Sequence, residues 1–345
     1  MRILLKHRIV VLTMLVVLSS LVVLSVSCTP NKQDNRSKLR LIAEPYAFDF
    51  VQWEAQALTS ALKGKDSTTE EAALRRQIAS VLVDEDICIS PPLAFKLEEP
   101  PHLLVISPRE KIVYLNRILL RQDMSLEEME KLEAQADTLG LSTLVAELGG
   151  FGGTYPPTVA ASLSRVDTID AAVEEWFHQY LALRPLGFLY LLDSIGVRPD
   201  PDIVTINETL AGIVSKEIGA EISARYYPGQ EKVKTDHNAS DFDFDAEMEQ
   251  TRKQVDNYLS ESKIAKAERY MEERRVMFVA NGYKIRKLNQ AYFAFHGIYG
   301  QDPTSVSLIY DDLKKLRDRS PSLKAFIANV ANMTSYDKLT RASGK

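Results

Sequence analysis

The chain has 345 residues, a formal net charge of −5 and only two cysteines. The acidic balance argues against nucleic acid as a partner. With so few cysteines, no disulfide framework can stabilise the fold. A chain of this length can bury a sizeable apolar core instead, as one large domain or two closely packed lobes.

The first residues have the pattern of an export signal. Met1–Arg8 is basic, and an apolar run from Ile9 to Val26 follows it. This order keeps the positive charge on the cytoplasmic side of a membrane and places the rest of the chain outside. We therefore expect the body of the protein on the extracytoplasmic face of a membrane.

The apolar run ends in Ser25-Val-Ser-Cys28. A small residue directly before a cysteine at this point is similar to a bacterial lipoprotein signal, although Ser25 stands where that pattern usually carries Leu. The resemblance implies a lipidated Cys28 in a bacterial cell envelope. An uncleaved membrane anchor is the alternative, because a run of this length is near the shortest that spans a bilayer.

These features predict the domain organisation. Residues 1–28 form a signal or anchor, and residues 29–40, which are largely polar, form a solvated tether. The remaining residues, 41–345, form a single mostly helical domain, with 41–165 and 166–345 as its alternative division into two lobes.

The first elements of the body are mixed. Apolar residues at helical spacing predict helices over Ala47–Leu62 and Ala72–Val83. Two short strands are expected at Leu93–Glu98 and His102–Ser107, and a helix is expected to open at Leu115–Leu120.

The middle of the chain contains two strong local signals. Ser125-Leu-Glu-Glu128 is a capping box, which predicts a helix that ends near Leu139. The segment Gly149–Pro157 contains four glycines and two prolines. It cannot form a regular helix, and glycines of this kind let a backbone approach another group closely.

Helices dominate the rest of the chain. One is expected from Asp167 to about Leu183 and another from Pro201 to about Tyr226. From Ala246 onward the sequence is almost wholly helical, with breaks at 281–282, 297–303 and 320–321. The fold class is therefore mainly α with a small β element (α+β).

Two of these helices contain the residues that could perform chemistry. Glu174 and His178 are four residues apart, so both side chains lie on one helical face, with Glu175 beside them. On the second helix, Glu208 shares its face with small residues such as Gly212. A glutamate among small residues is typical of close approach by another helix.

The two segments resemble the thermolysin-like zincins, the gluzincins. That family carries His-Glu-x-x-His on one helix and Asn-Glu-x-x-Ala on a later one. Its two histidines and second-helix glutamate hold zinc, and the glutamate of the first motif activates water. Here Glu175-Trp-Phe-His178 is similar to the end of the first motif, and Asn207-Glu208-Thr-Leu-Ala211 to the second.

The resemblance extends to a family of uncharacterised bacterial envelope proteins with a His-Glu-Trp-x-His motif. The resemblance implies a zincin-like helix pair in which Glu174, His178 and Glu208 bind zinc and Glu175 acts as general base. The departure is Glu174, which stands where the first histidine should be. A carboxylate can ligate zinc, but it makes the metal a poorer Lewis acid and shifts selectivity toward manganese or iron.

Further aromatic residues follow downstream. Tyr292, His296 and Tyr299 fall on one helical side, at steps of four and three. Zincins often use a downstream histidine or tyrosine to stabilise the oxyanion, so Tyr292 and His296 are catalytic candidates. The alternative is that these residues are ordinary core or interface aromatics.

Two functions remain open at this point. The first is a membrane-tethered, zincin-like metallopeptidase or its degenerate descendant. The second is a non-catalytic envelope protein that binds a peptide or protein partner. If the metal site exists, its three ligand groups should lie within about 5 Å of one another. If Glu174, Glu175 and His178 are instead ordinary surface charges, they should be solvated.

Overall fold

The computed structural model describes residues 30–62, 68–229 and 242–344. The apolar run and Cys28 lie outside the described residues, so the export signal stays a prediction. Among the described residues, no helix is long and apolar enough to cross a membrane.

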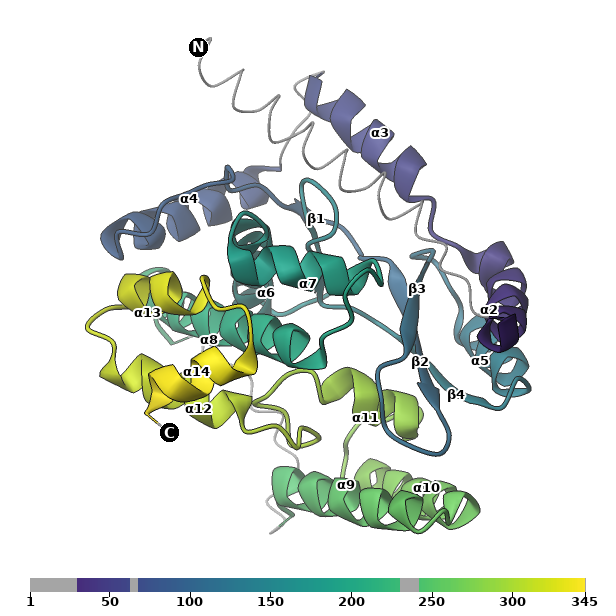
Figure 1. Ribbon diagram of the computed structural model, residues 1–345. Coiled ribbons are helices and arrows are strands. Elements are labelled where there is room, and N and C mark those ends of the chain that lie inside the picture. Colours follow the sequence, from purple (N-terminus) through teal and green to yellow (C-terminus); the bar gives the residue numbers. More distant parts are fainter. Residues whose placement is uncertain (1–29, 63–67, 230–241, 345) are drawn as a thin grey trace.

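The structure is mainly α-helical with two small three-stranded sheets, which confirms the predicted fold class (Figure 1). The helices are α2 (Pro30–Ala43), α3 (Phe50–Leu62), α4 (Thr69–Asp84), α5 (Leu126–Asp137), α6 (Arg165–Ala182), α7 (Pro185–Ser194), α8 (Pro201–Tyr226), α9 (Phe244–Ser260), α10 (Ile264–Ala280), α11 (Gln290–His296), α12 (Ile309–Arg319), α13 (Leu323–Val330) and α14 (Tyr336–Ser343). The strands are β1 (Lys96–Leu97), β2 (His102–Pro108), β3 (Asn116–Leu120), β4 (Leu141–Ala146), β5 (Gly150–Phe151) and β6 (Thr158–Val159).

The larger sheet has the strand order β3-β2-β4 and is antiparallel throughout. Alternate residues of β2 point to opposite faces. Leu104 and Ile106 pack with residues of α2 and α5, whereas Leu103 and Val105 pack with residues of α11. Figure 1 shows α5 and α11 on the two sides of this sheet.

One expectation about this region was wrong, and one strand was not predicted. Leu115–Leu120 was expected to open a helix, but Asn116–Leu120 is strand β3, because it pairs with β2 over five residues. Strand β4 was not predicted at all. Both strands owe their conformation to partners distant in sequence, which a local pattern does not contain.

The expected tether at 29–40 is also corrected. From Pro30 onward it is helical and belongs to α2. Near the end of this helix Leu39 and Ala43 are buried in the core beside the sheet, against residues such as Met129 and Leu132. The polar residues before Leu39 suggested a tether, although the C-terminal end of α2 has a short apolar face.

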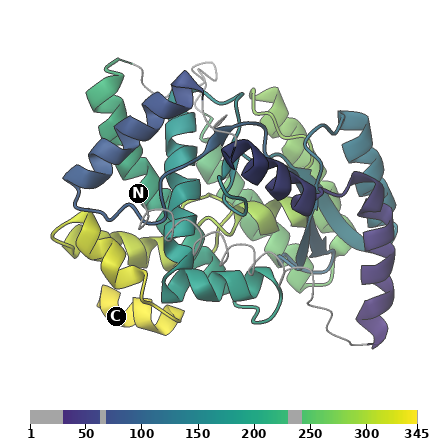
Figure 2. The ribbon, with the colours of Figure 1, turned by 90° about the horizontal axis from the view of Figure 1, so that it is seen from above.

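The core lies around α6 and α8, at the centre of the molecule (Figures 1 and 2). Helix α8 begins at Pro201, as predicted, and Asp200 caps it by accepting a hydrogen bond from Ile203 N. Trp176 and Phe177 of α6 are fully buried. The surrounding apolar cluster draws residues from both 41–165 and 166–345.

The smaller sheet positions the glycine-rich segment beside α6. Its order is β1-β6-β5, with β5 antiparallel to β6. Gln179 of α6 donates hydrogen bonds to the carbonyl oxygens of Gly152 (3.3 Å) and Thr154 (2.7 Å). The prediction that Gly149–Pro157 is not helical and lies close to another element is confirmed.

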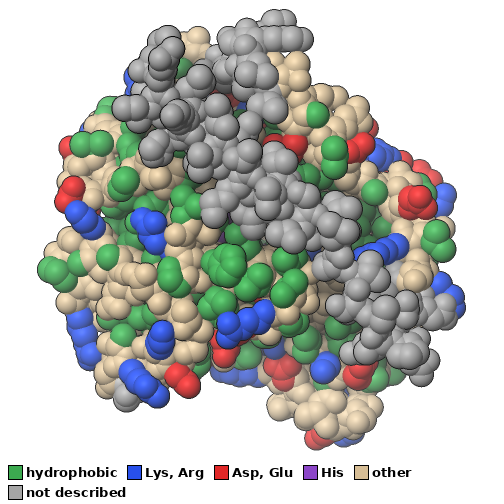
Figure 3. Space-filling model, turned by 45° about the horizontal axis from the view of Figure 1, so that its top comes forward, with side chains coloured by type: hydrophobic (Ala, Val, Ile, Leu, Met, Phe, Trp, Pro, Cys, Tyr) green, Lys and Arg blue, Asp and Glu red, His purple; other side chains and the backbone are tan. Residues whose placement is uncertain are grey.

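The face of the molecule in Figure 3 carries basic and acidic side chains scattered among apolar and neutral ones. Some large apolar side chains are exposed, among them Leu183, Phe188 and Val197, in and beside α7. Because its basic and acidic side chains are mixed, this face shows no extended patch of one charge sign.

Candidate metal centre

The first half of the centre is on α6. Ser164 caps this helix by accepting a hydrogen bond from Asp167 N, so the helix starts at Arg165, two residues before the predicted start at Asp167. Its apolar side, which includes Trp176, faces the core. Glu174, Glu175 and His178 lie on the other side.

The second half of the centre is on α8, which packs antiparallel to α6. Gly219 of α8 faces Asp170 near the start of α6, and Glu208 meets His178 further along. A methyl group on Gly219 would lie 1.9 Å from Asp170 Oδ1, so the Asp170 carboxylate occupies the space beside this glycine. The approach of the two helices brings Glu208 to the polar side of α6.

Glu174, His178 and Glu208 each offer one ligand atom, and these atoms lie within 4.8 Å of one another. The predicted convergence of the three groups within about 5 Å is therefore confirmed. A metal with ligands at about 2.0–2.2 Å would require only small side-chain rotations to draw the atoms together. This group can hold a metal ion.

The interpretation of these residues as solvated surface charges is wrong. The side chain of Glu208 is only 7% exposed and that of His178 only 14% exposed. Glu174 and Glu175 are half-buried. The helical wheel of α6 suggested an open face because it cannot show that α8 and β5 cover that face.

Glu208 is held by two neighbours. Its Oε2 lies 3.5 Å from His178 Nε2, and its Oε1 accepts a hydrogen bond of 2.7 Å from the Tyr190 hydroxyl. Burial by itself would raise the pKa of Glu208, but His178, Tyr190 and the Arg117 guanidinium lower it below its ordinary value. Glu208 is therefore a stable anion.

His178 has its ring fixed from both sides. Its Nδ1 lies 2.8 Å from Asn207 Oδ1, and the Tyr190 ring stacks on the imidazole with centroids 5.8 Å apart. A neutral imidazole that donates from Nδ1 leaves the Nε2 lone pair for a metal. Without a metal, burial disfavours the charged form, yet Glu208, Glu175 and Glu174 raise the pKa of His178 to about 10.

The remaining carboxyls lack sufficient positive charge. Burial raises the pKa of Glu174 to about 7 and that of Glu175 to about 8. All three carboxyl groups interact with His178, whereas Arg117 acts on Glu208 and Lys216 acts on Glu174. A buried carboxylate excess of this kind is the electrostatic signature of a cation site.

Glu175 is beside the metal group but does not belong to it. Its carboxylate points at the glycine-rich segment. A methyl group on Gly150 would lie 2.5 Å from Glu175 Oε1, and one on Gly152 would lie 2.8 Å from Oε2. The two glycines therefore provide the space that the Glu175 side chain occupies.

Three residues of the centre were not assigned a role from the sequence. Tyr190 belongs to α7, which was not predicted although Pro185 is a helix-start signal. Arg117 is on β3, which was expected to be helical. Tyr299 was noted only as an aromatic neighbour of His296. Burial and the nearby carboxylates of Glu208, Glu174 and Glu175 raise the pKa of Tyr299 well above its ordinary value, so this tyrosine lies close to the cluster.

Tyr292 and His296 are placed differently from Tyr299. Their rings lie 4.2 Å apart, and His296 Nδ1 is 3.6 Å from Asp302 Oδ2. Helix α11 ends at His296, and the chain turns at Gly297. Because the helix stops there, Tyr299 does not continue the helical side of Tyr292 and His296.

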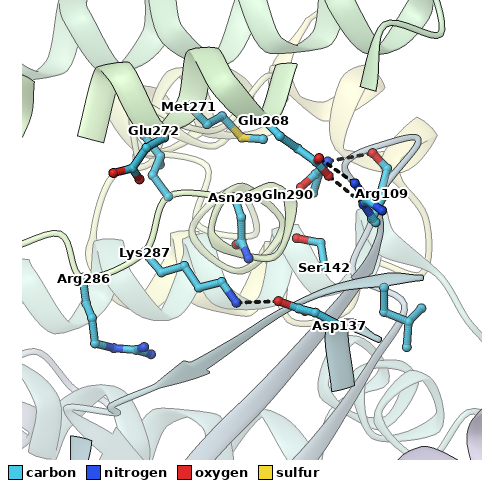
Figure 4. Close-up of a pocket in the computed structure, with 12 residues that line it drawn as sticks. Arg109, Asp137, Ser142, Glu268, Met271, Glu272, Arg286, Lys287, Asn289 and Gln290 are labelled. Carbon is cyan, nitrogen blue, oxygen red and sulfur yellow. Dashed lines mark hydrogen bonds and ion pairs between the residues drawn. The ribbon is translucent and has the colours of Figure 1, made fainter. Parts of the chain in front are cut away.

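One cavity of the described part of the chain lies away from these residues (Figure 4). It has a volume of about 370 Å³ and is lined by residues of α10, the α10–α11 connection and the edge of the larger sheet. Its charged side chains all have partners: Arg109 binds Glu268, Lys287 binds Asp137, Arg286 binds Glu133 and Glu272 binds Arg275. No side chain there is left with the unbalanced charge that marks the metal centre.

In comparisons with known proteins, no family model matches the sequence, and no curated protein or solved structure shows significant similarity to it.

Proposed function

We propose that this protein is a metal-dependent hydrolase of the zincin type, in which Glu174, His178 and Glu208 bind one divalent cation. The observation that supports it is the convergence of these three donors from two helices, with a fourth carboxylate, Glu175, directly beside them. A zinc ion held there would supply Lewis acidity for attack on a peptide carbonyl, with manganese or iron as alternatives for this carboxylate-rich set.

The chain's own groups have defined roles in this proposal. Glu175, whose carboxylate lies beside the three donors, accepts the proton of the attacking water and passes it to the leaving amine. The Tyr299 hydroxyl is buried close to the carboxylates of Glu208, Glu174 and Glu175, and we assign it as the donor to the oxyanion. Tyr190 and Asn207 orient Glu208 and His178.

We therefore assign to Tyr299 the role of oxyanion donor, for which the sequence had suggested Tyr292 and His296. Those two residues interact with Asp302, and we assign them to the support of the chain that carries Tyr299. The His296→Ala and Tyr299→Phe variants separate the two assignments. Tyr299→Phe should lower kcat by a hundredfold or more without loss of metal, on the order of the effect of removing one oxyanion donor.

The experiment that tests the proposal is a metal analysis. Protein purified without chelators should contain about one equivalent of zinc, manganese or iron by inductively coupled plasma mass spectrometry. The Glu208→Ala variant should contain none, whereas Glu221→Ala, at a partly exposed position more than three turns further along the same helix, should retain it. Wild-type protein that takes up no metal when incubated with each of these ions would refute the proposal.

A second function is favoured by one specific observation. The centre has a carboxylate at Glu174 where a zincin has an imidazole, which weakens the Lewis acidity of a bound ion. A protein that keeps the metal but hydrolyses no peptide would use the centre to bind a peptide or a partner. Peptide binding by the metal-loaded protein without turnover would favour this alternative.

We also propose that residues 1–28 attach the protein to the membrane of a bacterial envelope, with the helical body outside the cytoplasm. The basic residues before Ile9 and the cysteine at the end of the apolar run support it. Cys28→Ser should block processing and lipid labelling in cells. Equal labelling and migration of Cys28→Ser and wild type would replace lipidation with an uncleaved anchor.

A further inference from the structure

A second, smaller cavity lies beside the metal group, on α8. It has a volume of about 210 Å³, and its lining includes Gly212, Lys216, Gln301, Tyr310 and Arg317. It differs from the larger cavity because two chain segments connect it directly to the metal group.

The first connection is α8 itself. Gly212 follows Glu208 by one helical turn and Lys216 by two, about 6 Å and 12 Å along the axis. The positive charge of Lys216 acts on Glu174, the ligand group on the opposing helix. The cavity therefore begins about one helical turn from Glu208 and extends toward the C-terminal end of α8.

The second connection is the segment after α11. Gly300 N donates a hydrogen bond of 2.9 Å to Thr209 Oγ1, which holds this segment against α8. Tyr299 faces the metal group, and Gln301, two residues later, lines the cavity. A methyl group on Gly212 would lie 2.7 Å from Gln301 Nε2, so the glycine provides the space for the glutamine.

Most charges that line the cavity are paired. Arg317 binds Glu217 through contacts of 2.9 to 3.1 Å, and Lys314 Nζ lies 3.9 Å from Asp318. Lys216 differs, because none of the carboxylates in the described residues lies within ion-pair distance of it. The lining thus offers one ammonium group that is free to bind an anion.

The amide of Gln301 is also unsatisfied. Its Oε1 is buried and has no hydrogen-bond partner among the described residues. The amide oxygen and the NH₂ group of Gln301 exchange positions when the amide rotates. The side chain can therefore present its NH₂ to the cavity instead. An ammonium group and an amide that can donate form a suitable pair for a carboxylate.

We propose that this cavity binds a carboxylate of the substrate, held by Lys216 and Gln301. The proposal rests on the proposed function and defines its substrate class. An extended peptide spans about 3.5 Å per residue, so the carboxylate belongs one to three residues beyond the attacked bond. It is either the C-terminal carboxylate of a short peptide or an acidic side chain at that distance.

The test measures peptide binding by isothermal titration calorimetry to zinc-loaded protein that carries Glu175→Gln, which prevents turnover. The probes are trialanine, trialanine amide and the amide of Ala-Ala-Glu. We expect trialanine to bind roughly tenfold or more tightly than its amide, as for one charge-assisted contact. The Ala-Ala-Glu amide separates the two sources: tight binding by it alone assigns the cavity to an acidic side chain.

Lys216→Met should abolish the preference for a carboxylate, and Lys216→Glu should reverse it. Lys315→Met is the matched control, an exposed lysine on α12 that does not line the cavity. Equal binding of all three probes to the wild type, or an unchanged preference in Lys216→Met, overturns the proposal.

The carboxylate site and the metal proposal can fail separately. Because the cavity excludes the metal ligands, the preference for a carboxylate should persist in the metal-free Glu208→Gln protein. If the wild type binds no metal but retains this preference, only the hydrolase proposal fails. If metal binds and the probes do not differ, only the carboxylate site fails.

Discussion

Replacing Glu174 by glutamine should have opposite effects on the metal-free and the metal-loaded protein. Burial raises the pKa of Glu174 from 4.5 to about 7. A carboxyl whose pKa is raised on folding contributes stability that is fully present below its unfolded pKa and is lost as the pH rises through its folded pKa. The metal-free wild type should therefore lose stability between about pH 4.5 and pH 7.

The magnitude follows from the size of the shift. At 1.36 kcal/mol for each pKa unit, the ionised Glu174 lowers the free energy of unfolding by about 3 kcal/mol at pH 8.5. Glu174→Gln removes this cost and keeps the shape of the side chain. For a domain of this length, the metal-free variant should melt about 5 °C above the wild type at pH 8.5 and close to it at pH 4.5.

Zinc should reverse the order of the two melting temperatures, so that the wild type melts above Glu174→Gln. At a thousandfold excess over its dissociation constant, a ligand stabilises the protein that binds it by about 4 kcal/mol. The wild type should gain this stability, whereas Glu174→Gln, which lacks one anionic ligand, should gain much less. Thermal scans with and without a chelator measure both effects, with Glu273→Gln on exposed α10 as the control. A metal-free Glu174→Gln protein that melts below the wild type at pH 8.5, or an equal zinc-induced rise in both proteins, would refute the reasoning.

Three other substitutions test single contacts of the centre. Glu174→His should raise zinc affinity relative to manganese in a competition titration, because imidazole is the softer ligand; an unchanged ratio would show that residue 174 is not a ligand. Tyr190→Phe keeps the ring but removes the donor to Glu208, so metal affinity should fall roughly 10- to 100-fold, and unaltered affinity would contradict the positioning role. Gly150→Ala would place a methyl group 2.5 Å from Glu175 Oε1. This variant should lower peptidase activity at least tenfold, on the order of the loss expected from a misplaced catalytic group. The amount of bound metal, measured by mass spectrometry, should stay constant.

Local sequence signals determined the parts of the molecule that carry their own caps and periodicity. The capping box at Ser125 and the proline at Pro201 placed the starts of α5 and α8. The spacing of Glu174 and His178, together with the motif around Glu208, was enough to predict that three ligand groups converge. Helical geometry by itself places only Glu174 and His178 on one face, and the expectation that Glu208 joins them rested on the resemblance to the gluzincin motifs.

Other features depend on contacts between distant parts of the chain. Strand β3 is a strand because it pairs with β2, and the polar face of α6 is buried because α8 and β5 cover it. Tyr190 from α7, Arg117 from β3 and Tyr299 from the segment after α11 reach one cluster from elements that are far apart in sequence. Periodicity records which side of an element is apolar, but only packing decides what lies against the polar side. The raised pKa of Glu174 and Glu175 and the fixed ring of His178 follow from that packing.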